Sequence, residues 1–309
     1  MSKRQNRSCS AMGVLVAMAA VLAGGAQASP EENPKVDWQG DARWSKYNFT
    51  DLVDPYEEFD IWTELKAAYF LDEGRSAFGP YVSVLGVWST AADDKPWPGA
   101  FDWQRNAEAR LGLQWYPLAG QGEWLQALRL YGYYAARAYA SDTLDLQTDD
   151  WRGGVDYYHD NLPRDGEPIV VLAYANCAYR KTNFSLDNYD AVLAEFNLKV
   201  GPRVGNLPVL TRSQLVPYVL LEGAYAPKYD ERWWENYVRT GVGLRFYFDP
   251  TRRGKDFWSG FVQRFNIYAE YVRNVSWLGD DPADLGSKVE DYDFRCGLSF
   301  ATGGFFNER

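Results

Sequence analysis

The chain alternates apolar and polar side chains with a period of two between Arg105 and Pro117. Alanine, leucine and tryptophan occupy every second position from 107 to 115, and polar or small residues fill the positions between them. This period predicts an extended strand with one apolar and one polar face. The strand is longer than is usual in soluble proteins, and it matches the roughly 9–11 residues that a tilted strand needs to cross a bilayer.

The same alternation recurs along the chain and predicts ten further strands. They cover 59–71, 80–90, 125–138, 151–158, 169–180, 189–200, 215–225, 237–249, 261–273 and 291–301. Single-chain bacterial barrels have an even number of strands, so one more is required. Ala42–Phe49 is the only candidate, and its alternation is poor. The pattern therefore predicts about twelve strands, with ten or fourteen left open.

The connections between these strands alternate in length. Shorter turns are expected near 72–76, 118–123, 201–208 and 250–255, and longer polar links near 91–103, 141–150, 226–236 and 274–290. Outer-membrane barrels have short periplasmic turns and longer extracellular loops. We therefore predict an all-β, transmembrane antiparallel β-barrel over 58–309, preceded by a periplasmic segment and candidate first strand within 29–57, with both ends of the barrel chain on the periplasmic side.

The first residues have the composition of a secretory signal peptide. Lys3, Arg4 and Arg7 precede an apolar run over 11–23, and 26–28 reads Ala-Gln-Ala. A small residue on each side of the middle position is typical of a cleavage site, so residues 1–28 are expected to be removed. No later segment is apolar over the length of a transmembrane helix, and a mature chain that spans a membrane must therefore do so as a closed barrel.

Composition narrows the class of partner. The formal net charge is −10 and the isoelectric point about 4.8, which argues against nucleic acid as a partner. The mean hydropathy of −0.43 is compatible with a barrel, because only every second strand residue faces lipid. Aromatic residues make up 17% of the chain, as expected where strands cross membrane interfaces. An aromatic-rich soluble β-protein, such as a carbohydrate-binding sandwich, is the alternative.

Two cysteines follow the predicted cleavage site, Cys177 and Cys296. Both occupy apolar positions of predicted strands that are far apart in strand order. We expect two small outward-facing residues rather than a disulfide.

His159 is the only histidine and lies at the end of a predicted strand beside Asp160. Some outer-membrane lipid hydrolases use a serine that is activated by a membrane-facing histidine. His159 has the parity of outward residues, and Ser89 or Ser185 could serve as the nucleophile if the fold brought either close. The alternative is a polar residue at a turn.

The polar faces of the strands share one parity and are expected to line the lumen. The residues assigned to this lining are Glu64, Glu108, Arg110, Arg129, Tyr131, Tyr133, Arg137, Arg152, Asp156, Arg180, Glu195, Arg239, Arg245, Asp293 and Arg295. Mixed arginines and carboxylates can form ion pairs that plug a small barrel, or they can line a channel that selects solutes by charge. The tyrosines offer flat faces on which sugar rings could stack. The pattern leaves these interpretations open.

Two segments carry a family resemblance: TGVGLRFYFDP at 240–250 and DYDFRCGLSFATGGFF at 291–306. They resemble the C-terminal barrel of the phage N4 adsorption protein and related exopolysaccharide-export outer-membrane proteins. The resemblance covers about the last hundred residues, and any glycine-rich amphipathic strand would share part of it. It implies an outer-membrane location and a role in polysaccharide export or phage adsorption.

The sequence thus predicts an outer-membrane barrel that acts as a passive conduit, with polysaccharide or oligosaccharide export as its suggested role. A plugged structural or receptor barrel and a lipid hydrolase built on His159 are the alternatives, and a non-enzymatic role is favoured. Expected partners are outer-membrane lipid and lipopolysaccharide, with a polysaccharide or a periplasmic export partner as candidates. No cofactor and no metal site are expected.

Overall fold

The computed structural model describes twelve strands and two short helices. The described residues are 35–46, 58–71, 77–90, 105–140, 145–161, 167–185, 189–204, 212–229, 235–250, 257–280 and 291–302. The strands of the first half are β1 (Lys35–Ser45), β2 (Glu58–Ala68), β3 (Ala77–Ser89), β4 (Asn106–Tyr116), β5 (Leu128–Tyr139) and β6 (Asp149–Asp160). Those of the second half are β7 (Ile169–Arg180), β8 (Ala191–Pro202), β9 (Gln214–Tyr225), β10 (Tyr237–Tyr247), β11 (Asn266–Trp277) and β12 (Tyr292–Ala301). The helices are α2 (Glu123–Gln126) and α3 (Phe257–Arg264).

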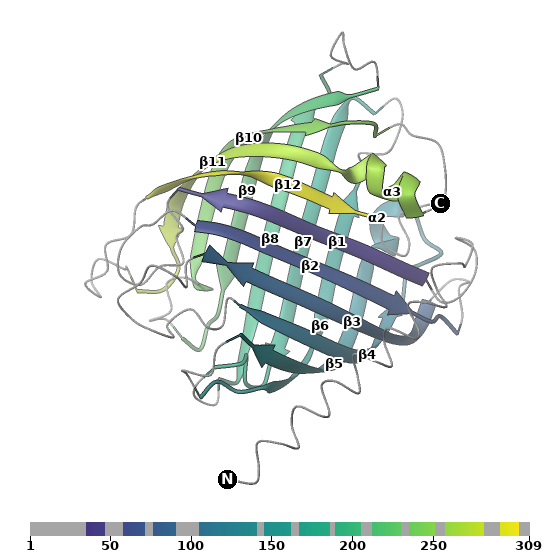
Figure 1. Cartoon of the computed structure of the whole chain (residues 1–309), viewed down its shortest axis with the longest axis vertical. Helices are drawn as coiled ribbons and strands as arrows, with labels where there is room; N and C mark the ends of the chain where they lie inside the picture. Colours follow the sequence, from purple (N-terminus) through teal and green to yellow (C-terminus); the bar gives the residue numbers. More distant parts are fainter. Residues whose placement is uncertain are drawn as a thin grey trace.

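The strands form a closed antiparallel barrel in which each strand pairs with its neighbours in the sequence. Strands β1 and β12 complete the ring, in a register that runs from Gln39 opposite Ala301 to Ser45 opposite Arg295. Figure 1 shows the strands running obliquely side by side around the wall. Because the ring closes, no strand of it presents an unpaired edge, which is the condition for a sheet in hydrocarbon. The predicted fold class is confirmed.

The two ends of the barrel are named here by what they carry. The terminal end holds the start of β1 and the end of β12, and the loop end holds the six connections that begin after β1, β3, β5, β7, β9 and β11. The chain thus enters and leaves the barrel at the same end, as the even strand number requires. The signal peptide predicted over 1–28 lies outside the described residues.

Three details of the predicted strands are wrong. The first strand is Lys35–Ser45 rather than Ala42–Phe49, because Asp37, Gln39 and Asp41 extend an alternating polar face in front of Ala42. The strand predicted from 125 begins at Leu128, after α2. The strand predicted from 261 begins at Asn266, because the preceding residues form α3. The short turn expected near 250–255 is therefore part of the longer connection between β10 and β11.

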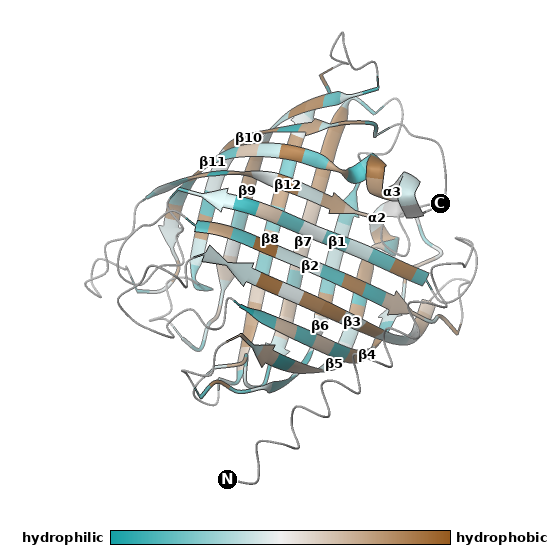
Figure 2. Cartoon of the chain, viewed as in Figure 1, coloured by the Kyte–Doolittle hydropathy of each residue, from teal (hydrophilic) through white to brown (hydrophobic). Residues whose placement is uncertain are grey.

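The outer wall is apolar and carries aromatic residues toward both ends. Figure 2 shows hydrophobic and hydrophilic residues alternating along the strands. Aromatic pairs near the loop end are Phe59–Trp88 and Tyr134–Trp151, and pairs near the terminal end are Trp38–Phe300 and Phe246–Phe248. Exposed aliphatic residues such as Leu111, Val219 and Val242 lie between these levels. Aromatic girdles around an apolar band are the pattern of a transmembrane barrel.

The two cysteines belong to this outer wall. Cys177 in β7 and Cys296 in β12 are exposed and free. The expectation of two outward-facing residues without a disulfide is therefore confirmed.

The helices lie at the terminal end and contact the outer wall. Phe261 of α3 stacks on Trp38 with ring centroids 5.8 Å apart, and it also packs against Phe300. Since Trp38 and Phe300 belong to β1 and β12, α3 covers the strand pair that closes the ring. Within the described part of the chain, neither helix has the length and apolarity to cross a bilayer.

The outer wall yields a test of membrane depth. Leu111 is 60% exposed at the centre of β4, and Leu125 is 54% exposed in α2 at the terminal rim. We expect Leu111→Arg to lower the free energy of unfolding in lipid vesicles by about 2–4 kcal/mol, because the guanidinium then lies at the bilayer midplane. Leu125→Arg, near the interface, should cost about 0–1 kcal/mol. Urea titration of both variants in vesicles measures the difference, and equal costs would contradict the assigned lipid-facing band.

Candidate functional site: a charge-lined lumen

The barrel encloses a cavity of about 710 Å³ to which all twelve strands contribute side chains. Its cations are Arg43, Lys66, Arg110, Arg129, Arg152, Arg180, Lys199, Arg245, Arg264 and Arg295. Its carboxylates are Asp37, Asp41, Glu64, Asp156, Asp160, Glu195, Glu222 and Glu270. Eight tyrosines also line it: Tyr81, Tyr116, Tyr131, Tyr133, Tyr158, Tyr174, Tyr247 and Tyr268. A strongly polar interior inside an apolar wall is the inverse of a soluble protein core.

The structure places the predicted lining residues in two groups. Eleven of the fifteen line the cavity: Glu64, Arg110, Arg129, Tyr131, Tyr133, Arg152, Asp156, Arg180, Glu195, Arg245 and Arg295. The other four, Glu108, Arg137, Arg239 and Asp293, also point inward but lie toward the loop end. There Glu108 pairs with Arg110 and Arg137, Arg239 pairs with Glu222, and Asp293 pairs with Arg295. Period-two parity thus assigned the inward direction of each, whereas depth along the barrel was not readable from it.

A chain of ion pairs runs along the wall formed by β2, β4 and β5. Arg110 donates from Nη1 to Glu64 over 2.9 Å and from Nε to Glu108 over 2.6 Å. Glu108 also accepts from Nη2 of Arg137 at 2.6 Å, and its side chain is fully buried. A buried carboxylate between two guanidiniums is held by charge-assisted hydrogen bonds, and removing one member leaves buried charge without compensation.

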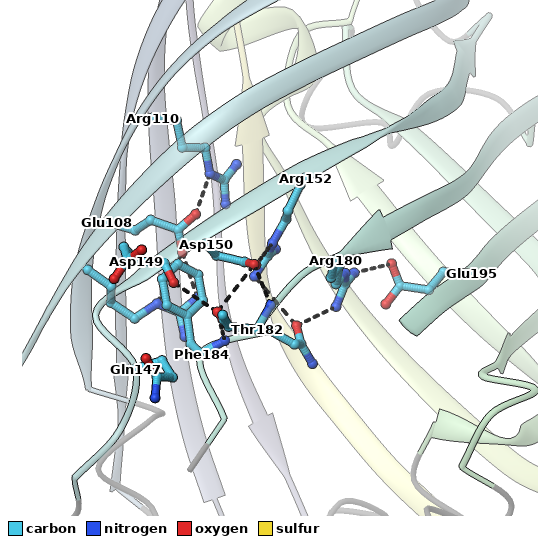
Figure 3. A network of polar contacts seen from close by, with 12 residues as sticks. Glu108, Arg110, Gln147, Asp149, Asp150, Arg152, Arg180, Thr182, Phe184 and Glu195 are labelled. Carbon is cyan, nitrogen blue, oxygen red and sulfur yellow. Dashed lines mark hydrogen bonds and ion pairs between the residues drawn. The ribbon is translucent and has the colours of Figure 1, made fainter. Parts of the chain in front are cut away.

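A short segment of the β7–β8 connection folds over this network (Figure 3). Phe184 is buried, with the guanidinium carbon of Arg137 3.7 Å and that of Arg152 5.1 Å from its ring centre. Thr182 donates its backbone N–H to Asp150 over 2.8 Å and its hydroxyl to the Asp149 carbonyl over 2.8 Å. We call residues 181–185 the strap, because they tie the loop end of β7 to β5 and β6.

The strap holds a backbone conformation that its residues rarely adopt. Asn183 has φ 46° and Phe184 has φ 56°. A left-handed conformation is unfavourable for a bulky residue such as phenylalanine, and it persists where surrounding contacts over-determine it. Here those contacts are the two arginines around Phe184, together with Asn183 Oδ1, which accepts from Arg180 over 3.2 Å. Strained segments of this kind cluster at switching sites.

Other polar pairs join strands that are not neighbours in the sheet. Lys199 of β8 donates to Glu270 of β11 over 2.6 Å, and the Tyr218 hydroxyl of β9 donates to the same carboxylate over 2.6 Å. Arg295 of β12 donates to Glu222 of β9 over 3.0 Å. Each of these pairs crosses part of the lumen, so they narrow the passage and brace the wall.

Two glycines allow tyrosine rings to lie against the wall. A Cβ at Gly112 would come within 2.8 Å of the Tyr81 ring, and a Cβ at Gly243 within 2.4 Å of the Tyr218 ring. Any larger residue at either position would push the ring into the lumen. The glycines on the polar face of the strands therefore keep space free in a narrow barrel.

The lumen is asymmetric along its axis. The cavity reaches residues at the terminal end, among them Asp37, Asp160 and Ala301. Inward side chains at the loop end are buried instead: Ser45, Glu58, Ser89, Asn106, Glu108, Asp150, Arg239 and Asp293. Among the described residues, the cavity extends from the terminal end past the middle of the barrel to Arg43, Arg152 and Arg180, and the inward side chains beyond these three are buried.

His159 does not have the surroundings that a hydrolase needs. It has outward parity but is 1% exposed, because the Trp124 ring of α2 stacks on it with centroids 3.7 Å apart. Its Nε2 has no hydrogen-bond partner. Ser89 and Ser185 lie at the loop end, whereas His159 lies at the terminal end. The serine–histidine arrangement considered from the sequence is therefore absent from these residues.

Several residues of the site escaped the sequence prediction. Asp41 lies on the part of β1 that precedes the predicted strand, Arg43 lies within the poorly alternating 42–49, and Arg264 lies on a helix that the pattern assigned to a strand. Parity could have found Glu270, since it follows the inward rhythm of β11. Phe184 had no signal at all, because its burial depends on the strap. Among the described residues, no three His, Cys, Asp or Glu side chains gather as a metal site.

Comparisons with known proteins assign no family to this chain. No protein-family model matches the sequence, and no curated protein matches it. Similar solved structures include the β domain of the Bordetella autotransporter BrkA, at 12% identity over 87% of this chain and 99% of that one, with a TM-score of 0.36. A bacterial polysaccharide outer membrane secretin matches at 7% identity over 89% and 98%, with a TM-score of 0.39. An active-site mutant of outer membrane phospholipase A from Escherichia coli matches at 12% identity over 90% and 96%, with a TM-score of 0.39.

The ion-pair chain predicts a large difference between two glutamates. Glu108→Gln removes the charge between Arg110 and Arg137 and should destabilise the barrel by about 3–5 kcal/mol. Glu195, whose side chain is 34% exposed and pairs with Arg180 over 3.2 Å, serves as the matched control. Glu195→Gln should cost at most about 1 kcal/mol, because water compensates the lost pair. Unfolding in vesicles measures both, and a small effect of Glu108→Gln would show that the buried network does not brace the wall.

Proposed function

We propose that this protein is an outer-membrane conduit for polar solutes, with an oligosaccharide or polysaccharide as its cargo, and that the described state is its closed form. The supporting observation is the cavity of about 710 Å³, whose lining is mostly charged and hydroxyl-bearing. Sites for small molecules usually have volumes of about 300–1,000 Å³. A cavity of this size inside an apolar wall supports passage or binding of a hydrated solute better than a purely structural role.

The chemistry of the lining favours a hydroxyl-rich cargo. Arginine and carboxylate side chains supply both donors and acceptors for sugar hydroxyls. The rings of Tyr131 and Tyr133 stack 5.7 Å apart on one strand, and Arg129 lies over the first while Arg110 lies over the second. Flat aromatic faces beside arginines give a surface on which sugar rings could slide. The resemblance of 240–250 and 291–306 to exopolysaccharide-export barrels supports the same cargo.

The strap gives such a conduit a gate. It contacts β5 and β6 through Phe184 and Thr182, and it lies where the inward side chains are buried. Release of Phe184 would free Arg137 and Arg152 from its ring and relieve the unfavourable backbone conformation of Phe184. Lipopolysaccharide at the loop end and an export partner at the terminal end are the partners this proposal implies.

A plugged structural or receptor barrel is the second candidate. The observation that favours it is the set of pairs that cross the lumen, such as Lys199–Glu270 and Arg295–Glu222. Braces of this kind stiffen a wall as well as they narrow a passage. A receptor of the phage-adsorption type would need only the loop end and no open lumen.

Planar-bilayer conductance distinguishes the two candidates. The wild-type protein should give rare, small openings, because the loop end is closed. The double variant Thr182→Ala, Phe184→Ala should raise the open fraction at least tenfold, because it removes the contacts that hold the strap. Arg212→Ala, at an exposed terminal-end residue, is the control and should behave as wild type.

The conductance of the strap variant distinguishes a gated conduit from a plugged barrel. Sustained current in the strap variant supports a gated conduit. A variant that inserts and folds but stays silent at all voltages contradicts the conduit and favours the plugged barrel. Far-ultraviolet circular dichroism and heat-dependent gel mobility verify that each variant is folded.

A further inference from the structure

A cluster of polar side chains gathers at the terminal end of the cavity. Arg245 of β10, Arg264 of α3 and Asp160 of β6 all line the cavity there, together with Tyr158 and Tyr247. The two tyrosine hydroxyls lie within electrostatic range of both arginines and of Asp160. Side chains from three separated elements thus converge on one small volume.

The arginines of this cluster have hydrogen-bonding capacity that the protein does not use. Arg264 is 5% exposed, and neither its Nε nor its Nη1 has a hydrogen-bond acceptor. Its ion pair with Asp160 is long, at 3.7 Å. The Nε of Arg245 also lacks an acceptor, and the rest of its guanidinium meets tyrosines. Buried donors without acceptors are costly, and they commonly mark the place of a missing partner.

The side chain of Asn266 adds an unused hydrogen-bond acceptor to the open arginine donors of the cluster. Asn266 lines the cavity two residues beyond Arg264 and donates its amide N–H to the Arg264 carbonyl over 2.9 Å and to Ser299 Oγ over 2.8 Å. Its Oδ1 is buried and receives no hydrogen bond. The cluster therefore presents three unused N–H donors from arginines and one unused amide oxygen.

The charge of the cluster is positive in its resting state. Two guanidiniums face one carboxylate, Asp160. The other carboxylates near the terminal half of the lumen are engaged elsewhere: Asp156 by Arg129, Glu270 by Lys199 and Tyr218, Asp41 by Tyr268, and Asp37 by Thr302. Glu270 and Asp41 also interact with Arg245 across the lumen, but both already accept hydrogen bonds from other side chains. An incoming anion would therefore meet open N–H donors on Arg245 and Arg264.

We infer that this cluster is a binding subsite for the carboxylate of an acidic saccharide. Arginine forks match a carboxylate in geometry and charge, and the free oxygen of Asn266 matches a neighbouring sugar hydroxyl. Tyr247 lines the cavity while it packs against the buried Val170 and Val216, and its ring is the apolar surface that the carbon face of a sugar would meet. The subsite rests on the proposed conduit for its place in transport, although binding itself does not require an open lumen.

Asp160 is expected to lower the affinity of the cluster for an anion. It occupies part of the charge of Arg264 and repels an incoming carboxylate. Replacing it with asparagine keeps the shape and removes the competitor. This change should therefore tighten anion binding, which is the opposite of what loss of a merely structural pair would do.

The test is calorimetric titration of the purified full-length protein in a non-ionic detergent with a uronic-acid disaccharide. A neutral disaccharide of the same size and inorganic phosphate serve as comparison ligands. We expect the acidic disaccharide to bind at least tenfold more tightly than either comparison ligand. Equal binding of the neutral disaccharide would show that the subsite does not recognise a carboxylate. Binding of phosphate without binding of either disaccharide would show that it does not recognise a saccharide.

Matched variants assign the binding to this cluster. Arg264→Gln and Arg245→Gln should each weaken binding of the acidic disaccharide at least tenfold, and Asp160→Asn should strengthen it about three- to tenfold. Arg212→Gln is the control, because Arg212 lies near the same end of the barrel with a 71% exposed side chain outside the cavity lining. It should leave the affinity unchanged.

Two results with these variants would overturn the subsite. One is weaker binding of the acidic disaccharide by folded Asp160→Asn, and the other is an equal loss of affinity in Arg212→Gln and Arg264→Gln. Folding is checked by heat-dependent gel mobility, and the gain expected for Asp160→Asn cannot arise from misfolding. Acidic disaccharide binding without conductance in the strap variant would retain the subsite and refute the conduit, so the two proposals fail separately.

Discussion

The structure depends on one constraint: inside a bilayer, every backbone N–H and C=O must find its partner within the protein. Twelve antiparallel strands meet it only because β1 pairs with β12 and closes the ring. Closure fixes the rest of the design. It makes every strand present one face to lipid and one to the lumen, and so it imposes the period of two. On the outside of this closing strand pair, Phe261 of α3 packs against Trp38 and Phe300.

Closure confines charged side chains to a narrow interior. Ion pairs there must be nearly complete, because an unpaired buried charge is costly. Glu108 between two arginines shows the rule, and the donors left open on Arg245 and Arg264 are exceptions to it. Open guanidinium nitrogens also occur toward the loop end, on Arg43 and Arg180, but on Arg245 and Arg264 they gather beside the free amide oxygen of Asn266. The strap braces the loop end, and this gathering of open donors and an acceptor is what sets the terminal end apart.

The sequence specified the wall better than the site. Period-two alternation predicted a barrel of about twelve strands and the inward direction of Arg110 and Glu195, because parity is a local property. It could not reveal that Phe184 packs between two arginines, since that contact joins a loop to two strands. Nor could it place Arg264, because α3 carries apolar residues that also suit a strand. Depth along the barrel and contacts between distant strands depend on register, which alternation does not encode.

The central claim is that a polar lumen is open at the terminal end and closed at the loop end. It is tested most directly by cysteine accessibility in a Cys177→Ser, Cys296→Ser background reconstituted in vesicles, with a small, membrane-impermeant maleimide on both sides. Ser299→Cys introduces a thiol where the cavity meets the terminal end, and Ser89→Cys introduces one at the buried loop end. The account predicts rapid modification of Ser299→Cys and protection of Ser89→Cys. Equal modification of both, or protection of Ser299→Cys in the folded barrel, would contradict it.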